Sequence, residues 1–453
     1  MEQKNALFEQ MPVRKAFFKL ALPVVLSMVV SLVYNMVDTY FIAKTGNAHL
    51  VAGVALGSPV FTLMIAVGDI FGLGGSSFIS RLFGQKRDQD GKRLSVFCFY
   101  GALFTGVGIT ALLLLLRTPL LTALGAQADT VQYARDYYTW IAVGAPFIIL
   151  SFTPCNQLRT EGFANASMIG SVLGAVVNIV LDPVLIFGCK LGAAGAAIAT
   201  VLSQAVGAAW IIRFLTGKKT ILRLRRDYLR PEKQIILPVL ALGISSFVML
   251  STESLLSISF SSSLARYGGD VAVGAMTVIT SASQLCTLPI QGICQGGQPV
   301  MSFNFGAGKK ARVKEAFRFQ LTLCGAYTCL FWLLMMLFPG AVAGIFTSDT
   351  ALIQYTTWAM RIYMAGIFAM GFQIACQQSF MALGQAKVSL LLACLRKIIL
   401  LIPLIFILPH LLPNPVFGVF LAEPVSDILA ATITTITFFA RFDKILDRGA
   451  AKV

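Results

Sequence analysis

Charged residues are scarce in this sequence. Asp, Glu, Lys and Arg make up only 12% of the 453 residues, whereas hydrophobic residues make up 57% and the mean hydropathy is +0.79. Soluble domains carry about 25% charged residues, so this composition excludes a soluble fold. Apolar stretches of the roughly 20 residues that a bilayer core requires are centred near residues 30, 66, 106, 144, 178, 204, 248, 285, 328, 365, 398 and 429. The sequence therefore predicts an all-α integral membrane protein with twelve transmembrane helices.

Histidine is rarer still. The only two, His49 and His410, fall in predicted short connections between spans, which argues against a His-based metal site or a Ser-His pair. The nine cysteines show no metal-ligand spacing, and their odd number argues against a complete disulfide framework. No cleavable signal peptide is expected, because the apolar segment after residue 19 is too long for one. We therefore expect a protein that is not an enzyme and that has no metal and no cofactor.

The two halves of the chain repeat one another. Between residues 74 and 167, matching residues recur at a constant offset of 222 without a gap. Direct repeats that fill a membrane chain are typical of transporters whose halves are related by an axis along the membrane normal, with substrate bound between them. The predicted organisation is an N-lobe (1–216), a basic linker (217–233) and a C-lobe (234–453). The matching pairs include Gly74 with Gly296, Phe83 with Phe305, Gln132 with Gln354, Gly162 with Gly384, and Ser167 with Ser389.

The basic residues are placed asymmetrically. The formal net charge is +16, and 26 of the 36 Lys and Arg residues fall on one side of the predicted topology, against 4 on the other. This is the positive-inside bias of membrane proteins, so it predicts that both termini are cytoplasmic and that no nucleic acid is bound. No loop is long enough to form a soluble domain. We expect a multi-pass monomer in the lipid bilayer of a bacterial cytoplasmic membrane.

A few ionisable residues lie inside the predicted spans. Asp38 lies in the first span, where Tyr34 and Asn35 share its helical face, and Asn178 and Asp182 are four residues apart in the fifth. A charged residue at a helix centre costs about 2.5 to 3.5 kcal/mol, so such residues are usually functional. Two carboxylates and an amide predict a site for a cation. The alternative is that each acid is a hydrogen-bonded core group or lies in the hydrated headgroup region.

Several longer motifs connect the chain to a known family. The sequence resembles the MATE (multidrug and toxic compound extrusion) transporters, and within them the MepA-like branch, over essentially its whole length. The resemblance implies a V-shaped, two-lobed bundle of twelve helices that exports hydrophobic organic cations in exchange for H⁺ or Na⁺ by alternating access. The motifs are the spacing from Pro23 to Asp38, GGSSFISR (74–81), RTEG (159–162), NIVLDP (178–183), GQPVMSFNFGA (297–307) and EPVSD (423–427).

The resemblance also implies roles for individual residues. The family's N-lobe cation site maps onto Asp38, Asn178, Asp182 and Thr200, and Pro23 corresponds to the proline at which the first helix bends. Proline removes one backbone hydrogen bond and permits a kink, so ion binding at Asp38 could be coupled to reshaping of that helix. An ordinary tolerated kink at Pro23 is the alternative.

Weaker expectations concern the substrate cleft. Glu253, in the seventh span, resembles an acid that some members place in the C-lobe; it could bind an ion, hold a cationic substrate, pair with Arg361, or have no role beyond the core. For Glu161, a salt bridge with Arg159 is the alternative to a place near the substrate path. Glu423 and Asp427 form a one-face acidic pair with no assigned role. The candidate cleft residues are Glu253, Asp69, Glu161, Met28, Met276 and Met301.

One related function remains open. A two-lobed exporter of the same superfamily could flip a lipid-linked precursor, and such a protein would line its cavity with several Arg and Lys to hold pyrophosphate. Only Arg361, Arg396 and Lys397 are candidates within the spans. Composition and motifs leave open which ion, H⁺ or Na⁺, drives transport.

Overall fold

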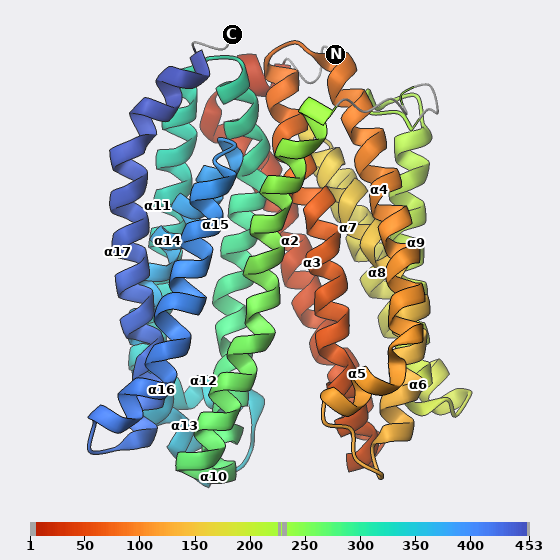
Figure 1. The fold of residues 1–453 in the computed structure, drawn as a ribbon, viewed down its shortest axis with the longest axis vertical. Helices are drawn as coiled ribbons and strands as arrows, with labels where there is room; N and C mark the ends of the chain where they lie inside the picture. The colour runs from red at the N-terminus through yellow and green to blue at the C-terminus, as the bar shows by residue number, and fades with distance from the viewer. Residues whose placement is uncertain (1–5, 225–227, 229–232, 451–453) are drawn as a thin grey trace.

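The computed structural model describes residues 6–224, 228 and 233–450, and these residues are almost entirely helical (Figure 1). Part of the predicted linker (225–227 and 229–232) lies outside the described residues. The N-terminal half contains η1 (Ala6–Gln10), α2 (Val13–Lys44), α3 (Ala48–Gly84), α4 (Asp88–Leu115), α5 (Arg117–Ala123), α6 (Val131–Val143), α7 (Ala145–Thr160), α8 (Ala164–Pro183), η2 (Val184–Gly188) and α9 (Gly192–Thr216). The C-terminal half contains α10 (Lys233–Gly306), α11 (Lys310–Leu337), α12 (Pro339–Phe346), α13 (Thr350–Tyr363), η4 (Met364–Gly366), α14 (Ile367–Ala382), α15 (Ala386–Cys394), η5 (Leu395–Leu401), α16 (Ile402–Leu411) and α17 (Pro415–Ala450).

The helices account for the twelve predicted spans. Ten helical segments of the described chain are long and apolar enough to cross a bilayer, and the bent pair α6 and α7, at 49° to each other, forms another crossing. The segment α10 contributes two crossings, because its backbone leaves the helical conformation at Gly269, with φ 66° and ψ −163°. Glycine reaches that conformation without a Cβ clash. The expectation of an all-α membrane fold with twelve spans is confirmed.

The repeat in sequence is also a repeat in space. A Cβ on Gly84 would meet the carbonyl oxygen of Phe303, and a Cβ on Gly306 would meet the carbonyl oxygen of Arg81. These two contacts exchange under the 222-residue offset, since 81 corresponds to 303 and 84 to 306. The crossing of α3 with the second half of α10 therefore lies on the pseudo-twofold axis that relates the two halves, here called the N-lobe and the C-lobe.

The two lobes contact each other near one end of the molecule. At that end Ser77 Oγ donates a hydrogen bond to the carbonyl of Met381 (2.8 Å), and Gln298 donates to the carbonyl of Leu73 (3.3 Å). Figure 1 shows the helices of the two lobes converging at the end that carries both termini and diverging toward α5, α6, α12 and α13. The lobes are thus closed on the side of the termini and separated on the other.

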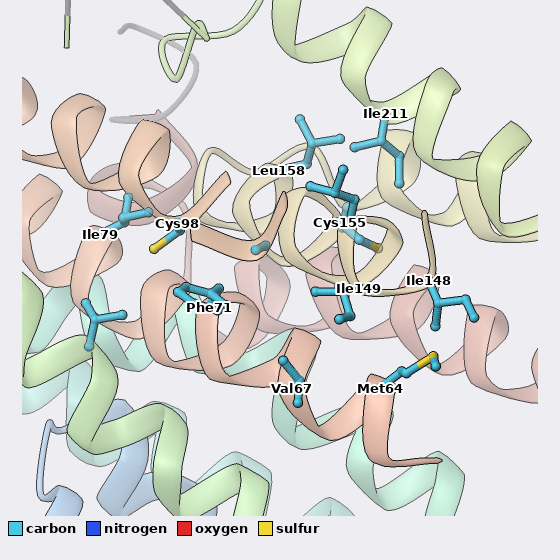
Figure 2. Packing of buried hydrophobic residues seen from close by; sticks show 14 of the residues in the cluster. Met64, Val67, Phe71, Ile79, Cys98, Ile148, Ile149, Cys155, Leu158 and Ile211 are labelled. Atoms are coloured by element: carbon cyan, nitrogen blue, oxygen red, sulfur yellow. The ribbon is translucent and has the colours of Figure 1, made fainter. Parts of the chain in front are cut away.

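Apolar packing holds each lobe together. Figure 2 shows part of the N-lobe core, where side chains from α3 and α7 interdigitate. Small residues permit the helices to approach closely: at Gly68 of α3, a Cβ would lie 3.2 Å from the carbonyl oxygen of Ile149 in α7. This rigid layer supports the face of the lobe that carries the polar residues described next. The labelled core residues are Met64, Val67, Phe71, Ile79, Cys98, Ile148, Ile149, Cys155, Leu158 and Ile211.

Candidate cation-coupling site

The N-lobe holds a compact acidic site between α2 and α8. Asp38 comes from α2, which packs along α8, and its carboxyl group lies within hydrogen-bonding distance of that of Asp182. One turn earlier on α8, Asn178 Nδ2 donates to Asp182 Oδ1 at 3.4 Å. Asp182 and Asn178 are only 0% and 1% exposed. The two acids that the sequence places 144 residues apart therefore form one site.

This site lacks positive charge. Asp38 Oδ1, Asn178 Oδ1 and Asp182 Oδ2 are buried without hydrogen-bond partners, and among the described residues neither acid has a Lys or Arg ion-pair partner. Two carboxylates in contact repel each other unless a proton or a cation lies between them, and oxygen atoms are the ligands that hard cations prefer. The arrangement can hold either a shared proton or a small cation.

Other predicted residues lie around the acids in different ways. Tyr34 is close enough to interact electrostatically with both Asp38 and Asp182, and so is Tyr137 of α6. Asn35 is exposed. Tyr137 was not among the predicted residues, because its approach to the acids depends on the packing of α6 and leaves no pattern in the chain.

The hydroxyl of Thr200 is bonded to its own helix. Thr200 is buried on α9, which packs against α8, and its Oγ1 donates to the carbonyl of Ala196 at 3.0 Å. Because the hydroxyl is the donor in this bond, its oxygen retains lone pairs that can coordinate a cation.

Pro23 lies buried in α2, fifteen residues before Asp38. The helix runs without a break from Val13 to Lys44, and Ser27 Oγ donates to the carbonyl of Pro23 at 2.9 Å. Because proline has no N–H, the helix lacks one backbone hydrogen bond here. The α2 helix therefore passes through a weakened point between the acidic site and its own first turns.

The C-lobe contains a second group of charges. Glu253 of α10 pairs with Lys397 of η5, whereas Arg361 is exposed on α13. The neighbouring Arg396 binds two acids of α17 at once, Glu423 at 3.2 Å and Asp427 at 2.7 Å. The predicted alternative, an ion pair between Glu253 and Arg361, is therefore wrong, because Glu253 pairs with Lys397. Sequence position could have suggested this, because Arg396 and Lys397 lie in the middle of the eleventh span.

Comparison with known proteins identifies the family. A family model described as MatE matches residues 23–184 and again residues 245–407. The chain belongs to the MatE family. It is 28% identical over 428 residues to the multidrug export protein MepA of Staphylococcus saprophyticus, with 94% of each chain covered, and the MepA of Staphylococcus aureus strain N315 matches to the same extent.

The fold also matches solved structures. A crystal structure of MATE in complex with MaL6 and the outward-facing conformation of a multidrug resistance MATE family transporter each superpose with a TM-score of 0.93. Both are 25% identical in sequence, and the matches cover 98% of this chain and 99% of theirs. The expected membership of the MATE family, in its MepA-like branch, is confirmed. The chain is a multi-pass membrane protein of that fold.

The methionines proposed for the cleft occupy different environments. Met276 lines a C-lobe cavity together with Glu253. Met28 is half-buried on α2, and Met301 is 1% exposed in the core, where its sulfur accepts from Ser379 Oγ at 3.7 Å. Of the three, Met276 is the one that the structure places on a cavity wall.

The two remaining acids are buried in the N-lobe. Asp69 of α3 lies within electrostatic range of Arg159. Glu161 follows α7 and accepts hydrogen bonds from Thr220 Oγ1 (2.6 Å) and from the backbone N–H groups of residues 221 (2.8 Å) and 222 (2.7 Å). Glu161 therefore anchors the start of the connection between the lobes.

Proposed function

We propose that this chain is a multidrug efflux antiporter, which exports hydrophobic organic cations in exchange for H⁺ or Na⁺ by alternating access. The observation that carries the proposal is the contact between the half-buried Asp38 and the buried Asp182, two acids without a basic partner among the described residues. The MepA relatives, which are multidrug export proteins, support the class of cargo. Transport of this kind needs no bond to be made or broken in the cargo, so the proposal assigns no enzymatic step.

The direction of exchange follows from the shape and the charge distribution. The lobes touch at the end that carries the termini, and the positive-inside bias assigns that end to the cytoplasm. The separated side then faces outward, in line with the match to an outward-facing family member. We infer a single chain acting alone in a bacterial cytoplasmic membrane, which loads its driving cation from outside. The membrane potential contributes about 2.3 kcal/mol per charge per 100 mV to inward movement.

The α2 helix provides a route from the acidic site to the contact between lobes. Asp38 is part of the site, and Pro23 lies within the segment where Ala21 packs on Gly296 and Val25 packs on Gly292 of α10. A bend at Pro23 would change this packing directly. We infer that cation binding between Asp38 and Asp182, by removing their repulsion, favours one shape of α2 and so one arrangement of the lobes.

Ethidium efflux from proteoliposomes under an imposed H⁺ or Na⁺ gradient tests the proposal and names the coupling ion. Asp38→Asn and Asp182→Asn should each reduce gradient-driven efflux to near background, because the amide cannot exchange a proton or neutralise a cation. Asp270→Asn removes an exposed carboxylate of the C-lobe, next to the break in α10 at Gly269, and should leave efflux unchanged. Full efflux by a folded Asp38→Asn protein, or no efflux by the unmodified protein under either gradient, would contradict the proposal.

A further inference from the structure

The C-lobe contains a cavity of about 260 Å³ beside its charged cluster. Both halves of α10 contribute to its wall, together with α13, η5 and α17. Its lining includes the carboxylates of Glu253 and Glu423, the ring of Phe260 and the thioether of Met276. Hydroxyl groups complete it at Ser257, Ser261, Thr277, Thr280 and Ser281.

The charges around this cavity do not balance. Three acids, Glu253, Glu423 and Asp427, face two bases, Arg396 and Lys397, which leaves one formal negative charge in excess. Arg396 is fully engaged, because it binds Asp427 through Nε (2.9 Å) and NH2 (2.7 Å) and Glu423 through NH2 (3.2 Å).

Lys397 is the less constrained base. It donates to the carbonyl of Met249 at 2.6 Å and to one carboxylate only, that of Glu253. Its long, flexible side chain carries a point charge that can change partners, unlike the planar fork of an arginine.

Glu253 is the most accessible charged group of the cavity, whose wall also includes Glu423, Arg396 and Lys397. The side chain of Glu253 is 57% exposed, whereas that of Lys397 is only 7% exposed. Glu423 is 8% exposed and lines the cavity, and its Oε2 is buried without a hydrogen-bond partner. A molecule entering the cavity therefore meets carboxylate oxygen, hydroxyl groups and aromatic surface, which together favour a positive charge.

The site lies on spans equivalent to those of the N-lobe acidic site, although not at equivalent residues, since Glu253 corresponds to Ser31 under the 222-residue offset. The acids of the N-lobe lie on its first and fifth spans, α2 and α8; the charges of the C-lobe lie on the seventh, eleventh and twelfth spans, which are the first, fifth and sixth of the second repeat. The difference is that the C-lobe carries its own cation, Lys397.

We propose that the C-lobe cavity binds an organic monocation at Glu253, and that Lys397 is a tethered competitor which holds Glu253 when no cargo is present. The inference rests on the proposed export of organic cations. An incoming cation binds the Glu253 carboxylate in place of Lys397, which stays hydrogen-bonded to the carbonyl of Met249. When Lys397 pairs with Glu253 again, the cargo is released. Lys397 thus lowers affinity so that export can turn over.

Binding of tetraphenylphosphonium to the purified full chain tests this, because its charge cannot be lost by deprotonation. Lys397→Met should bind it roughly tenfold or more tightly, since the Glu253 carboxylate then has no competing cation and attracts the phosphonium charge over a short distance, and should export it more slowly per cycle. Lys397→Arg keeps a cation and should show no such gain. Lys314→Met, which removes an exposed lysine paired with Asp443 (2.7 Å), is the matched control and should be unchanged.

Two further variants test the role of Glu253, and the first of them does not depend on whether Lys397→Met folds. Glu253→Gln should bind tetraphenylphosphonium more weakly than the unmodified protein, and the double variant Glu253→Gln/Lys397→Met should lose the gain of Lys397→Met. Triphenylphosphine oxide, a neutral molecule of similar size, should bind all of them alike.

The outcomes separate this inference from the proposed function. Export of the phosphonium by the unmodified protein, combined with unchanged affinity in Lys397→Met and Glu253→Gln, would overturn the role of the C-lobe site alone. A gain that persists in the double variant would also overturn it, because the gain would not depend on Glu253. Absence of both binding and export in the unmodified protein would overturn the two proposals together.

Discussion

Individual ionisable residues are stabilised in opposite ways in the two lobes. In the N-lobe, Asp38 and Asp182 contact each other and leave oxygen atoms unpaired. In the C-lobe, Arg396 and Lys397 neutralise acids that would otherwise have no partner of opposite charge. A buried charge is costly unless it is paired, so the N-lobe arrangement requires an external proton or cation, whereas most of the C-lobe network is satisfied from within the chain.

A substitution of Arg396 tests this contrast between the two lobes. Arg396→Met should lower the free energy of unfolding by about 3–5 kcal/mol, because it leaves Glu423 and Asp427 buried without their common partner. Thermal unfolding of the purified protein in detergent would show a lower midpoint. Arg361→Met removes an exposed arginine of the same lobe and should leave the midpoint unchanged. Equal midpoints for both variants would mean that the Arg396 network does not stabilise the lobe.

At the scale of the helices, close crossings depend on glycine. Gly84 and Gly306 bring α3 and the second half of α10 into backbone contact at the pseudo-twofold axis, and Gly292 and Gly296 do the same for α2 and α10. In a membrane, helices associate through such close packing because the lipid is as apolar as the side chains. The contact that closes the molecule on one side is therefore made largely of backbone.

A methyl group at the axis should interfere with that closure. Gly306→Ala would place a Cβ against the carbonyl oxygen of Arg81, so the two helices must move apart. Overpacking of this kind costs about 1–3 kcal/mol, and we expect a lower unfolding midpoint together with reduced ethidium efflux. Gly108→Ala, where a Cβ would meet nothing within 4 Å, is the control. Normal stability and efflux in Gly306→Ala would show that the crossing tolerates separation.

At the scale of the whole molecule, both described ends of the chain lie on the side where the lobes meet (Figure 1). The even number of spans requires this, and the distribution of Lys and Arg predicts which side of the membrane it is. The proposed outward-facing state depends on that assignment.

Fusions to the C-terminus test the orientation. A green fluorescent protein fused after residue 453 should fluoresce in a bacterial host, and alkaline phosphatase fused at the same point should be inactive, because the former folds and the latter fails to fold on the cytoplasmic side. The same pair fused within the α12–α13 connection at residue 348 should give the reverse result. Active phosphatase at the C-terminus would reverse the direction of transport proposed here.

The sequence alone was sufficient for the membrane fold, the twelve spans and the family. Each of these depends on local composition or on residues at constant spacing. The length of an apolar stretch determines whether it can span the membrane. The 222-residue offset relates Gly84 to Gly306 in the sequence itself. The pairing of Asn178 with Asp182 was visible for the same reason, since four residues make one helical turn.

Tertiary structure decided which distant charges meet. Tyr137 lies near Asp38 because of how α6 packs, and Lys397 reaches Glu253 across 144 residues because η5 lies beside α10. Helical periodicity states which face of a helix a side chain occupies, but not which other helix that face contacts. The network of Arg396, Lys397 and their three acids, and the cavity beside it, exist only once the spans of the C-lobe have packed together.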